Sequence, residues 1–169
     1  VKRDELTDRE WQAKVKSGGV LSDDGRTWYP SESYKFGATT GADQNVSTWA
    51  ETREDFERMR DFLRPVMVSI HHCENVLLEG VTFQNSPCWN IHPEMCRNLI
   101  VRDITVRCPD YAQNSDGIDI ESCKNVVLTG SRFDVGDDGI CIKSGKDQAG
   151  RGRGSLCGKI YGYHFVGFH

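Results

Sequence analysis

Three segments of this chain repeat one pattern, and that repetition limits the available folds more than any other feature does. The segments are CENVLLEGVTF from Cys73, CRNLIVRDITV from Cys96 and CKNVVLTGSRF from Cys123. Each contains a cysteine, a charged residue, an asparagine, a strand-like run, a short polar turn and another short strand. Their starts lie 23 and 27 residues apart. Self-similarity at this spacing indicates a repeat architecture.

A second set of short strands, WNIH, GIDI and GICI, recurs at a similar phase. One repeat has too little apolar surface to be stable alone, so neighbouring repeats must stack. Alternation in GIDIES and GICIKS places the isoleucines on one face and Asp119 or Cys141 on the other. We therefore predict an all-β fold, an incomplete right-handed parallel β-helix. A leucine-rich repeat is disfavoured because its L-x-x-L-x-L signature is absent.

The repeated asparagines and cysteines occupy equivalent turns of the predicted solenoid. Stacked Asn75, Asn98 and Asn125 can form a ladder of side-chain amides that satisfies polar groups in the turns. The three cysteines that begin the repeats are expected to stack at one corner. The chain has seven cysteines, an odd number, spread at one per apolar segment, which favours buried free thiols over a disulfide framework or a zinc site.

The chain divides by composition into two parts. Residues 1–64 are rich in Gly, Ser, Thr and Asp, which predicts an irregular segment. Within it, apolar residues at helical spacing predict one short helix near 48–63. Residues 65–169 form the partial β-helix that carries the acidic motifs. The capping residues expected for the helix are Ser47 or Thr48, with Glu51.

Composition excludes several classes of partner. A net charge of −4 and a pI of about 5.7 give no support for binding nucleic acid or an anionic membrane surface. No apolar run approaches the roughly 18 residues that a membrane span needs. The first residues, VKRDELTDRE, contain no signal-peptide core, so we expect either a cytoplasmic protein or a missing start.

Two acidic motifs fall on neighbouring repeats. Asp116 in NSDGID precedes Asp137 in GDDG by just under one repeat, and neighbouring strands are about 4.8 Å apart. We therefore expect Asp116, Asp137 and Asp138 to form one carboxylate cluster. Like charges at close range raise the pKa of at least one member. Such a cluster suits glycosidic-bond cleavage, in which one acid donates a proton and another activates water across roughly 6.5–9.5 Å in inverting enzymes.

Other interpretations of the acids stay open from residue chemistry alone. An EF-hand loop from Asp134 fails, because glycines occupy ligand positions. A calcium site of another kind would suit clustered carboxylates. A single GDDG is also typical of a solvated turn, although the second acidic motif one coil away argues against that interpretation.

The region from Arg64 to Gly145 resembles family 28 of the glycoside hydrolases, the polygalacturonases and their exo-acting and rhamnogalacturonan-cleaving relatives. The resemblance is carried by RPVMVSIHHCENVLLEGVTFQNSPCWNIHPEMCRNLIVRDITV, NSDGIDIESCKNV and FDVGDDGICIKSGKD. It implies a right-handed parallel β-helix that hydrolyses galacturonate linkages of pectin with inversion, with no cofactor and no metal. It also implies a secreted or periplasmic location.

The resemblance assigns roles to residues of this chain. Asp137 would be the general acid, while Asp116 and Asp138 would position and deprotonate the attacking water. Asn114, at the start of the motif N-T-D that reads N-S-D here, would help to hold the site or the sugar. Asp119 is a supporting candidate, and a structural role in the turn suits it equally.

The chain departs from the family pattern in its motifs for substrate binding. It contains neither the G-H-G motif, whose histidine supports the acid, nor the R-I-K motif, whose cations bind the substrate carboxylate. His164 and Lys143 are the substitutes we consider, against a surface histidine and a solvated lysine. The segment LSDDGRTWYP matches the usual DGxGxxWW only weakly. We expect a truncated, weakly active or inactive form.

Two other functions remain as alternatives. One is a calcium-dependent β-helix similar to pectate lyases, and the other is a non-catalytic carbohydrate-binding fragment. In each case the expected partner is pectin or an oligogalacturonide. An uncapped solenoid end would also expose a sheet edge, so we expect self-association if the chain ends at His169.

Overall fold

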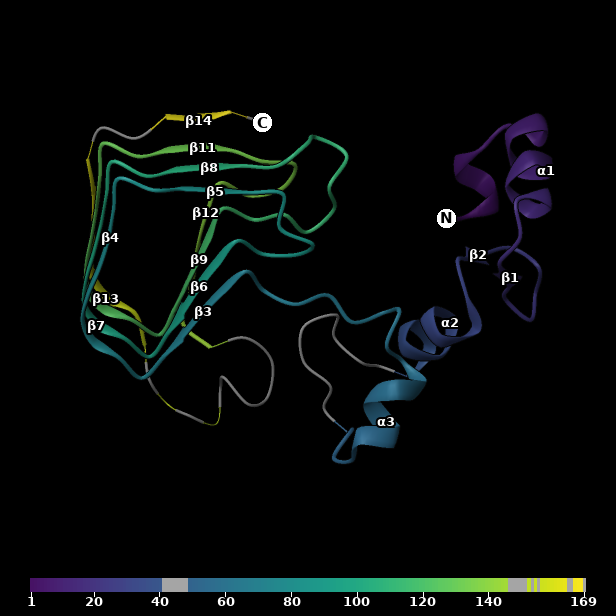
Figure 1. Ribbon diagram of the computed structural model, residues 1–169, viewed down its shortest axis with the longest axis horizontal. Coiled ribbons are helices and arrows are strands. Elements are labelled where there is room, and N and C mark those ends of the chain that lie inside the picture. The colour runs from purple at the N-terminus through teal and green to yellow at the C-terminus, as the bar shows by residue number, and fades with distance from the viewer. Residues whose placement is uncertain (41–48, 146–151, 153, 155, 164–165, 169) are drawn as a thin grey trace. The chain divides into compact units, whose positions relative to one another are not determined.

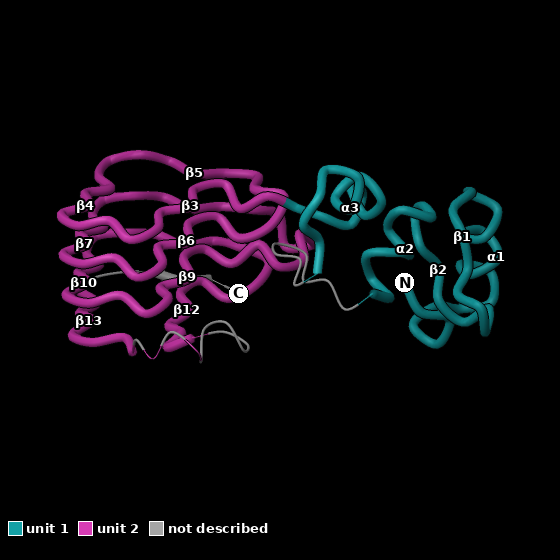
Figure 2. The backbone as a smooth tube through the Cα atoms, turned by 90° about the horizontal axis from the view of Figure 1, so that it is seen from below, with its two compact units in different colours: residues 1–64 teal, residues 65–169 magenta. Residues whose placement is uncertain are grey.

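The computed structural model describes residues 1–40, 49–145, 152, 154, 156–163 and 166–168. The chain forms two compact units, Val1–Arg64 and Pro65–His169 (Figure 2).

The second unit is a parallel β-helix, as the repeats predict. In the described part of this unit, three four-stranded sheets form the sides of the coil (Figure 1). Sheet 1 contains β3 (Val68–His71), β6 (Ile91–Glu94), β9 (Ile118–Glu121) and β12 (Ile140–Lys143). Sheet 2 contains β4 (Glu74–Glu79), β7 (Arg97–Arg102), β10 (Lys124–Thr129) and β13 (Gly158–Tyr163). Sheet 3 contains β5 (Thr82–Gln84), β8 (Thr105–Arg107), β11 (Arg132–Asp134) and β14 (Val166–Phe168).

Each strand pairs with the equivalent strand of the next coil, so like residues stack. Ile118 of β9 is in register with Ile91 on one side and Ile140 on the other. Their side chains join those of Leu99 and Phe133 in the core enclosed by the three sheets. Alternation along each strand accounts for this arrangement, because every second side chain of a strand points inward.

The predicted asparagine ladder is confirmed on sheet 2. The Nδ2 of Asn98 donates to Oδ1 of Asn75 at 3.0 Å, and the Nδ2 of Asn125 donates to Oδ1 of Asn98 at 3.1 Å. All three residues have φ between 55° and 58°, the left-handed region that asparagine tolerates better than most residues. Each asparagine therefore makes the turn and also links its coil to the next.

The repeated cysteines stack at one corner, as predicted. Cys96 and Cys123 are fully buried, and the backbone N–H of Cys96 donates to Sγ of Cys123 at 3.4 Å. Burial raises the pKa of the Cys123 thiol to about 12. Both cysteines are free thiols in this structure.

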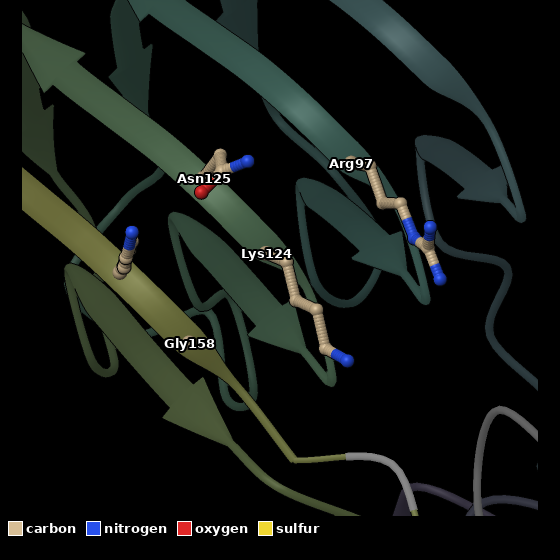
Figure 3. Close-up of a pocket in the computed structure, with 5 residues that line it drawn as sticks. Arg97, Lys124, Asn125 and Gly158 are labelled. Atoms are coloured by element: carbon tan, nitrogen blue, oxygen red, sulfur yellow. The ribbon is translucent and has the colours of Figure 1, made fainter.

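A fourth repeat, which sequence reasoning did not identify, begins at Cys157. The register pairs Gly158 with Lys124, so Lys159 takes the ladder position of Asn125, and it keeps the left-handed φ at 54°. The sequence does not show this coil clearly, because glycine and lysine replace the charged residue and the asparagine. An open pocket surrounds these positions, and Figure 3 shows the Arg97 and Lys124 side chains side by side on neighbouring strands.

The first unit contains more helix than predicted. Besides a 3-10 turn (η1, Arg3–Glu5) and a small hairpin (β1, Val20–Leu21; β2, Trp28–Tyr29), its described residues form three α-helices. These are α1 (Asp8–Lys16), α2 (Glu32–Thr39) and α3 (Arg53–Arg58). The helix expected near 48–63 is present as the shorter α3, whereas α1 and α2 were not predicted.

The capping residues explain these differences. In α3, Thr52 caps the helix and Asp55 completes the capping box, in place of the predicted Glu51. Ser47 and Thr48 lie outside the described residues. A second capping box, Thr7 with Glu10, begins α1 and was visible in the sequence as TDRE. Among the described residues, no helix has the length and hydropathy of a membrane span.

Candidate active site

The two acidic motifs end at the starts of neighbouring strands of sheet 1. Asp116 and Gly117 lead into β9, and Asp138 and Gly139 lead into β12. The N–H of Gly117 donates to the carbonyl oxygen of Asp138 at 2.9 Å. The parallel register that follows places Asp116 and Asp138 at equivalent positions of successive coils.

Asn90, on the preceding coil, holds the turn that carries Asp116. Its side chain is fully buried, and its Nδ2 donates to the carbonyl oxygens of Asp116 at 3.0 Å and Ser115 at 3.3 Å. The hydroxyl of Ser115 in turn accepts from the N–H of Gly136 at 3.0 Å. These bonds tie three successive coils together around the acids. Sequence reasoning missed Asn90, whose partners lie about one repeat further along the chain.

Asp116, Asp137 and Asp138 lie together at this edge. One carboxylate oxygen from each lies within 4.8 Å of the others. These closest oxygens are nearer to one another than the carboxyl separation anticipated for an inverting enzyme. Asp116 is buried, whereas Asp137 and Asp138 are exposed. The N–H of Asn114 donates to Oδ2 of Asp137 at 3.2 Å, so the backbone of Asn114 contacts the cluster.

Burial and neighbouring like charge raise the pKa of the buried acid in the cluster. Burial raises the pKa of Asp116, and the charge of Asp137 raises it further. Cys141, which the sequence predicted on this outer face, contacts both stacked acids. Its Sγ lies 3.2 Å from Oδ2 of Asp138 and 3.5 Å from Oδ2 of Asp116. Burial and the hydrogen bond to Asp138 raise the pKa of Cys141, so this side chain is a protonated thiol at neutral pH.

Asp119 and Lys143 form a buried ion pair next to the cluster. Oδ1 of Asp119 pairs with Nζ of Lys143, and Nζ also lies 4.0 Å from the centre of the Trp89 ring. The Asp119 side chain is completely buried, and burial raises its pKa to about 6 despite the lysine. Lys143, which the sequence suggested for substrate binding, is half-buried here, and its ammonium group is engaged by protein groups.

The outer face of sheet 1 carries histidine–glutamate contacts that join successive coils. His92 Nε2 lies 3.0 Å from Oε2 of Glu121, and His71 Nδ1 lies 2.6 Å from Oε2 of Glu94. The ring of His92 also packs edge-on against Trp89. Sequence reasoning missed these pairs, because each joins residues more than twenty positions apart. His164, the remaining predicted site residue, lies outside the described residues.

Comparison with known proteins finds a matching family and similar sequences. The model of the family "Glycosyl hydrolases family 28" matches residues 12–151. The chain is 34% identical over 89 residues to a probable polygalacturonase of Vitis vinifera, covering 53% of this chain and 18% of that protein. It is 29% identical over 107 residues to an endo-polygalacturonase of Pectobacterium parmentieri, covering 63% and 27% respectively.

A solved structure is also similar. The crystal structure of a hyperthermoactive exopolygalacturonase from Thermotoga maritima matches with a TM-score of 0.54 and 33% identity. The match covers 72% of this chain and 34% of that one. The chain therefore spans about a fifth to a third of the length of these relatives.

Proposed function

Because the chain belongs to glycosyl hydrolase family 28, we propose that it acts on galacturonate-type linkages of pectin as a glycoside hydrolase. The observation that carries the proposal is the cluster of three carboxylates at the starts of β9 and β12. Named polygalacturonases among the similar proteins support pectin as the substrate class. Extracellular action on this polymer is part of the same proposal.

The proposed mechanism divides the acids by their surroundings. Asp137 is exposed and is the proposed general acid, which protonates the leaving glycosidic oxygen. Asp116 and Asp138 stack on successive coils and are proposed to hold the attacking water between them, so that one of them removes its proton. Attack from the side opposite the leaving group inverts the anomeric carbon, which NMR of the first-formed product tests directly.

The cationic part of the site is reduced in this chain. An acidic polymer approaching an acidic protein needs local positive charge. The chain contains neither G-H-G nor R-I-K, and Lys143 is paired with Asp119. We therefore propose that this 169-residue chain hydrolyses polygalacturonate slowly and with weak substrate binding.

The test is release of reducing ends from polygalacturonate by the chain and by Asp137→Asn. Loss of the general acid should lower the rate by about 10²- to 10⁴-fold. Asp110→Asn, which neutralises an exposed acid outside the cluster, should leave the rate unchanged. Equal rates for the chain and Asp137→Asn would overturn the assignment of Asp137.

Chelation separates the hydrolase from the lyase-like alternative. Hydrolysis should persist in a calcium chelator and should yield no product with ultraviolet absorption. Calcium-dependent formation of an unsaturated product would favour a lyase instead. Oligogalacturonide binding without any turnover would favour a non-catalytic binding fragment.

A further inference from the structure

A thiol lies against the stacked acids, and the proposed hydrolysis gives it no role. Cys141 is in register with Asp119 on the neighbouring strand, and its Sγ also contacts Asp116 and Asp138. Oxygens of Asp116 and Asp119 and this sulfur all lie within 4.8 Å of one another. One sulfur and several carboxylate oxygens therefore converge from β9, β12 and the turns before them.

Two sulfur–oxygen separations are close to those expected around a tetrahedral zinc ion. Zinc–sulfur bonds of about 2.3 Å and zinc–oxygen bonds of about 2.0 Å place sulfur and oxygen about 3.5 Å apart across a tetrahedral angle. The distance from Cys141 Sγ to Asp116 Oδ2 is 3.5 Å, and the distance to Asp138 Oδ2 is 3.2 Å. Asp138 belongs to a separate group with Asp116 and Asp137, so its side chain must move to join Asp119 at one ion.

A second observation independently points to a ligand. Oδ2 of Asp119 is buried and has no hydrogen-bond partner among the described residues, while Oδ1 is held by Lys143. An unsatisfied buried carboxylate oxygen costs free energy unless something binds it. The Asp119 side chain is completely buried and lies close to Cys141 and Asp116, which could also bind a metal ion. Its Oδ2 is therefore a possible metal ligand that no described hydrogen bond occupies.

We propose that Asp116, Asp119, Asp138 and Cys141 form a binding site for a thiophilic divalent cation, for which Zn²⁺ is the natural size and Cd²⁺ the best probe. A thiolate donor favours such ions over calcium or magnesium, which prefer oxygen ligands alone. Binding converts the Cys141 thiol to a thiolate and releases its proton to solvent, so the site with its cation and Lys143 carries one net negative charge.

A cation bound at this site would compete with the proposed hydrolysis. The inhibition expected here rests on that proposed function. Asp116 and Asp138 cannot bind a cation and hold the attacking water at the same time. A bound ion therefore inhibits the enzyme by occupying the water-activating pair. Lys143 opposes binding, because its ammonium group already neutralises Asp119.

The experiment titrates the 169-residue chain with CdCl₂ and with ZnCl₂, without substrate. We expect saturation at one ion per chain, a cadmium–thiolate absorption band and release of one proton per ion. Cys141→Ala should abolish the band and weaken binding by about 100-fold or more, and Asp119→Asn should weaken it by about 10- to 100-fold. Lys143→Met should strengthen binding.

Cys73→Ala is the matched control. Cys73 is a free thiol of the corner stack, and its Sγ donates to the carbonyl oxygen of His71, so this variant should bind like the unaltered chain. A band unchanged in Cys141→Ala, or an affinity unchanged in Asp119→Asn, overturns the proposal. Circular dichroism shows whether each variant is folded. If either Cys141→Ala or Asp119→Asn unfolds, the other variant still tests the proposal.

Because these readouts need no turnover, they separate the metal site from the proposed function. Binding without inhibition in an active chain would overturn the competition while leaving the site. An inactive chain that still binds cadmium through Cys141 would overturn the hydrolase alone. Calcium binding of equal strength in Cys141→Ala would show a carboxylate site that does not use the thiol, and would also overturn the proposal.

Discussion

Two stacks of polar side chains run across successive coils of this β-helix, and they behave in opposite ways. On sheet 2, Asn75, Asn98 and Asn125 donate and accept in sequence, so each amide satisfies the next. At the edge of sheet 1, Asp116 and Asp138 stack with the same coil spacing, but ionised carboxylates only accept hydrogen bonds. The first stack links the coils, and the second places like charges together.

The comparison shows what repetition means in a solenoid. A side chain repeated in successive coils, such as the ladder asparagine of three coils, stabilises the coils themselves. A side chain that differs between equivalent strands does not stabilise the coils in this way. At one register position, for example, sheet 1 presents Ser69, His92, Asp119 and Cys141. The functional candidates lie where the repeat is broken.

The largest effect on stability should come from a substitution at Gly117, where the coils that carry the stacked acids approach each other closely. A Cβ at Gly117 would lie 2.6 Å from the Phe133 ring and would also clash with the backbone of Gly139. We expect Gly117→Ala to destabilise the chain by about 3 kcal/mol. Gly139→Ala, whose Cβ would meet only Phe133 at 3.4 Å, should cost far less. Equal urea midpoints for the two variants would contradict the close approach.

Removing the middle asparagine of the ladder should also lower the stability of the chain. Asn98→Ala loses two ladder hydrogen bonds and an asparagine in the left-handed region, so we expect a loss of about 2 kcal/mol. Asn75→Ala loses one of these bonds at the same backbone conformation, and should cost about 1 kcal/mol less. Chemical denaturation of both variants measures this difference. Equal losses would show that the backbone conformation, rather than the ladder, provides the stability.

The buried pair on sheet 1 should give the stability a pH dependence. The pKa of Asp119 is about 6 in the folded chain, above its ordinary value of 3.8, so the folded state binds the proton more tightly than the unfolded state. Stability from this group is therefore greatest below about pH 4 and is lost as pH rises through about 6, by up to about 3 kcal/mol. Asp119→Asn should flatten that part of the profile, whereas Asp110→Asn should not. A profile unchanged by Asp119→Asn would refute the assignment.

The smallest expected effect is a gain in stability from extending the asparagine ladder to the fourth coil. Lys159 holds the ladder position of the fourth coil with the same left-handed backbone, but its side chain cannot continue the amide chain. Lys159→Asn should add a hydrogen bond to Asn125 and stabilise the chain by about 0.5 to 1 kcal/mol. Lys124→Asn, on the same strand pair but outside the ladder, should give no gain. A midpoint that Lys159→Asn leaves unchanged would mean that the ladder ends at Asn125.

The sequence predicted those features that recur. The parallel β-helix, the asparagine ladder and the cysteine corner follow from residues at matching repeat positions. The fourth coil was missed because Lys159 stands where asparagine was the marker. In the first unit, α1 was missed although its capping box was present, because its short length and polar composition concealed it among turn-forming residues.

The candidate site was only partly predictable for a physical reason. The three acids were found because two local motifs lie about one coil apart. The contact of Cys141 with Asp138, the pairing of Lys143 with Asp119 and the histidine–glutamate pairs depend on side-chain directions on separate coils. No local pattern in the sequence encodes those directions.

We propose that the carboxylate stack serves chemistry at the expense of stability, and Asp116→Asn tests this most directly. This change removes one like charge from the buried end of the stack and keeps an oxygen that can accept from Cys141. Measured side by side at pH 7, polygalacturonate hydrolysis should fall by about 100-fold or more while the free energy of unfolding stays equal or rises. A variant that is less stable by more than about 1 kcal/mol, or that keeps its full hydrolysis rate, would contradict the claim.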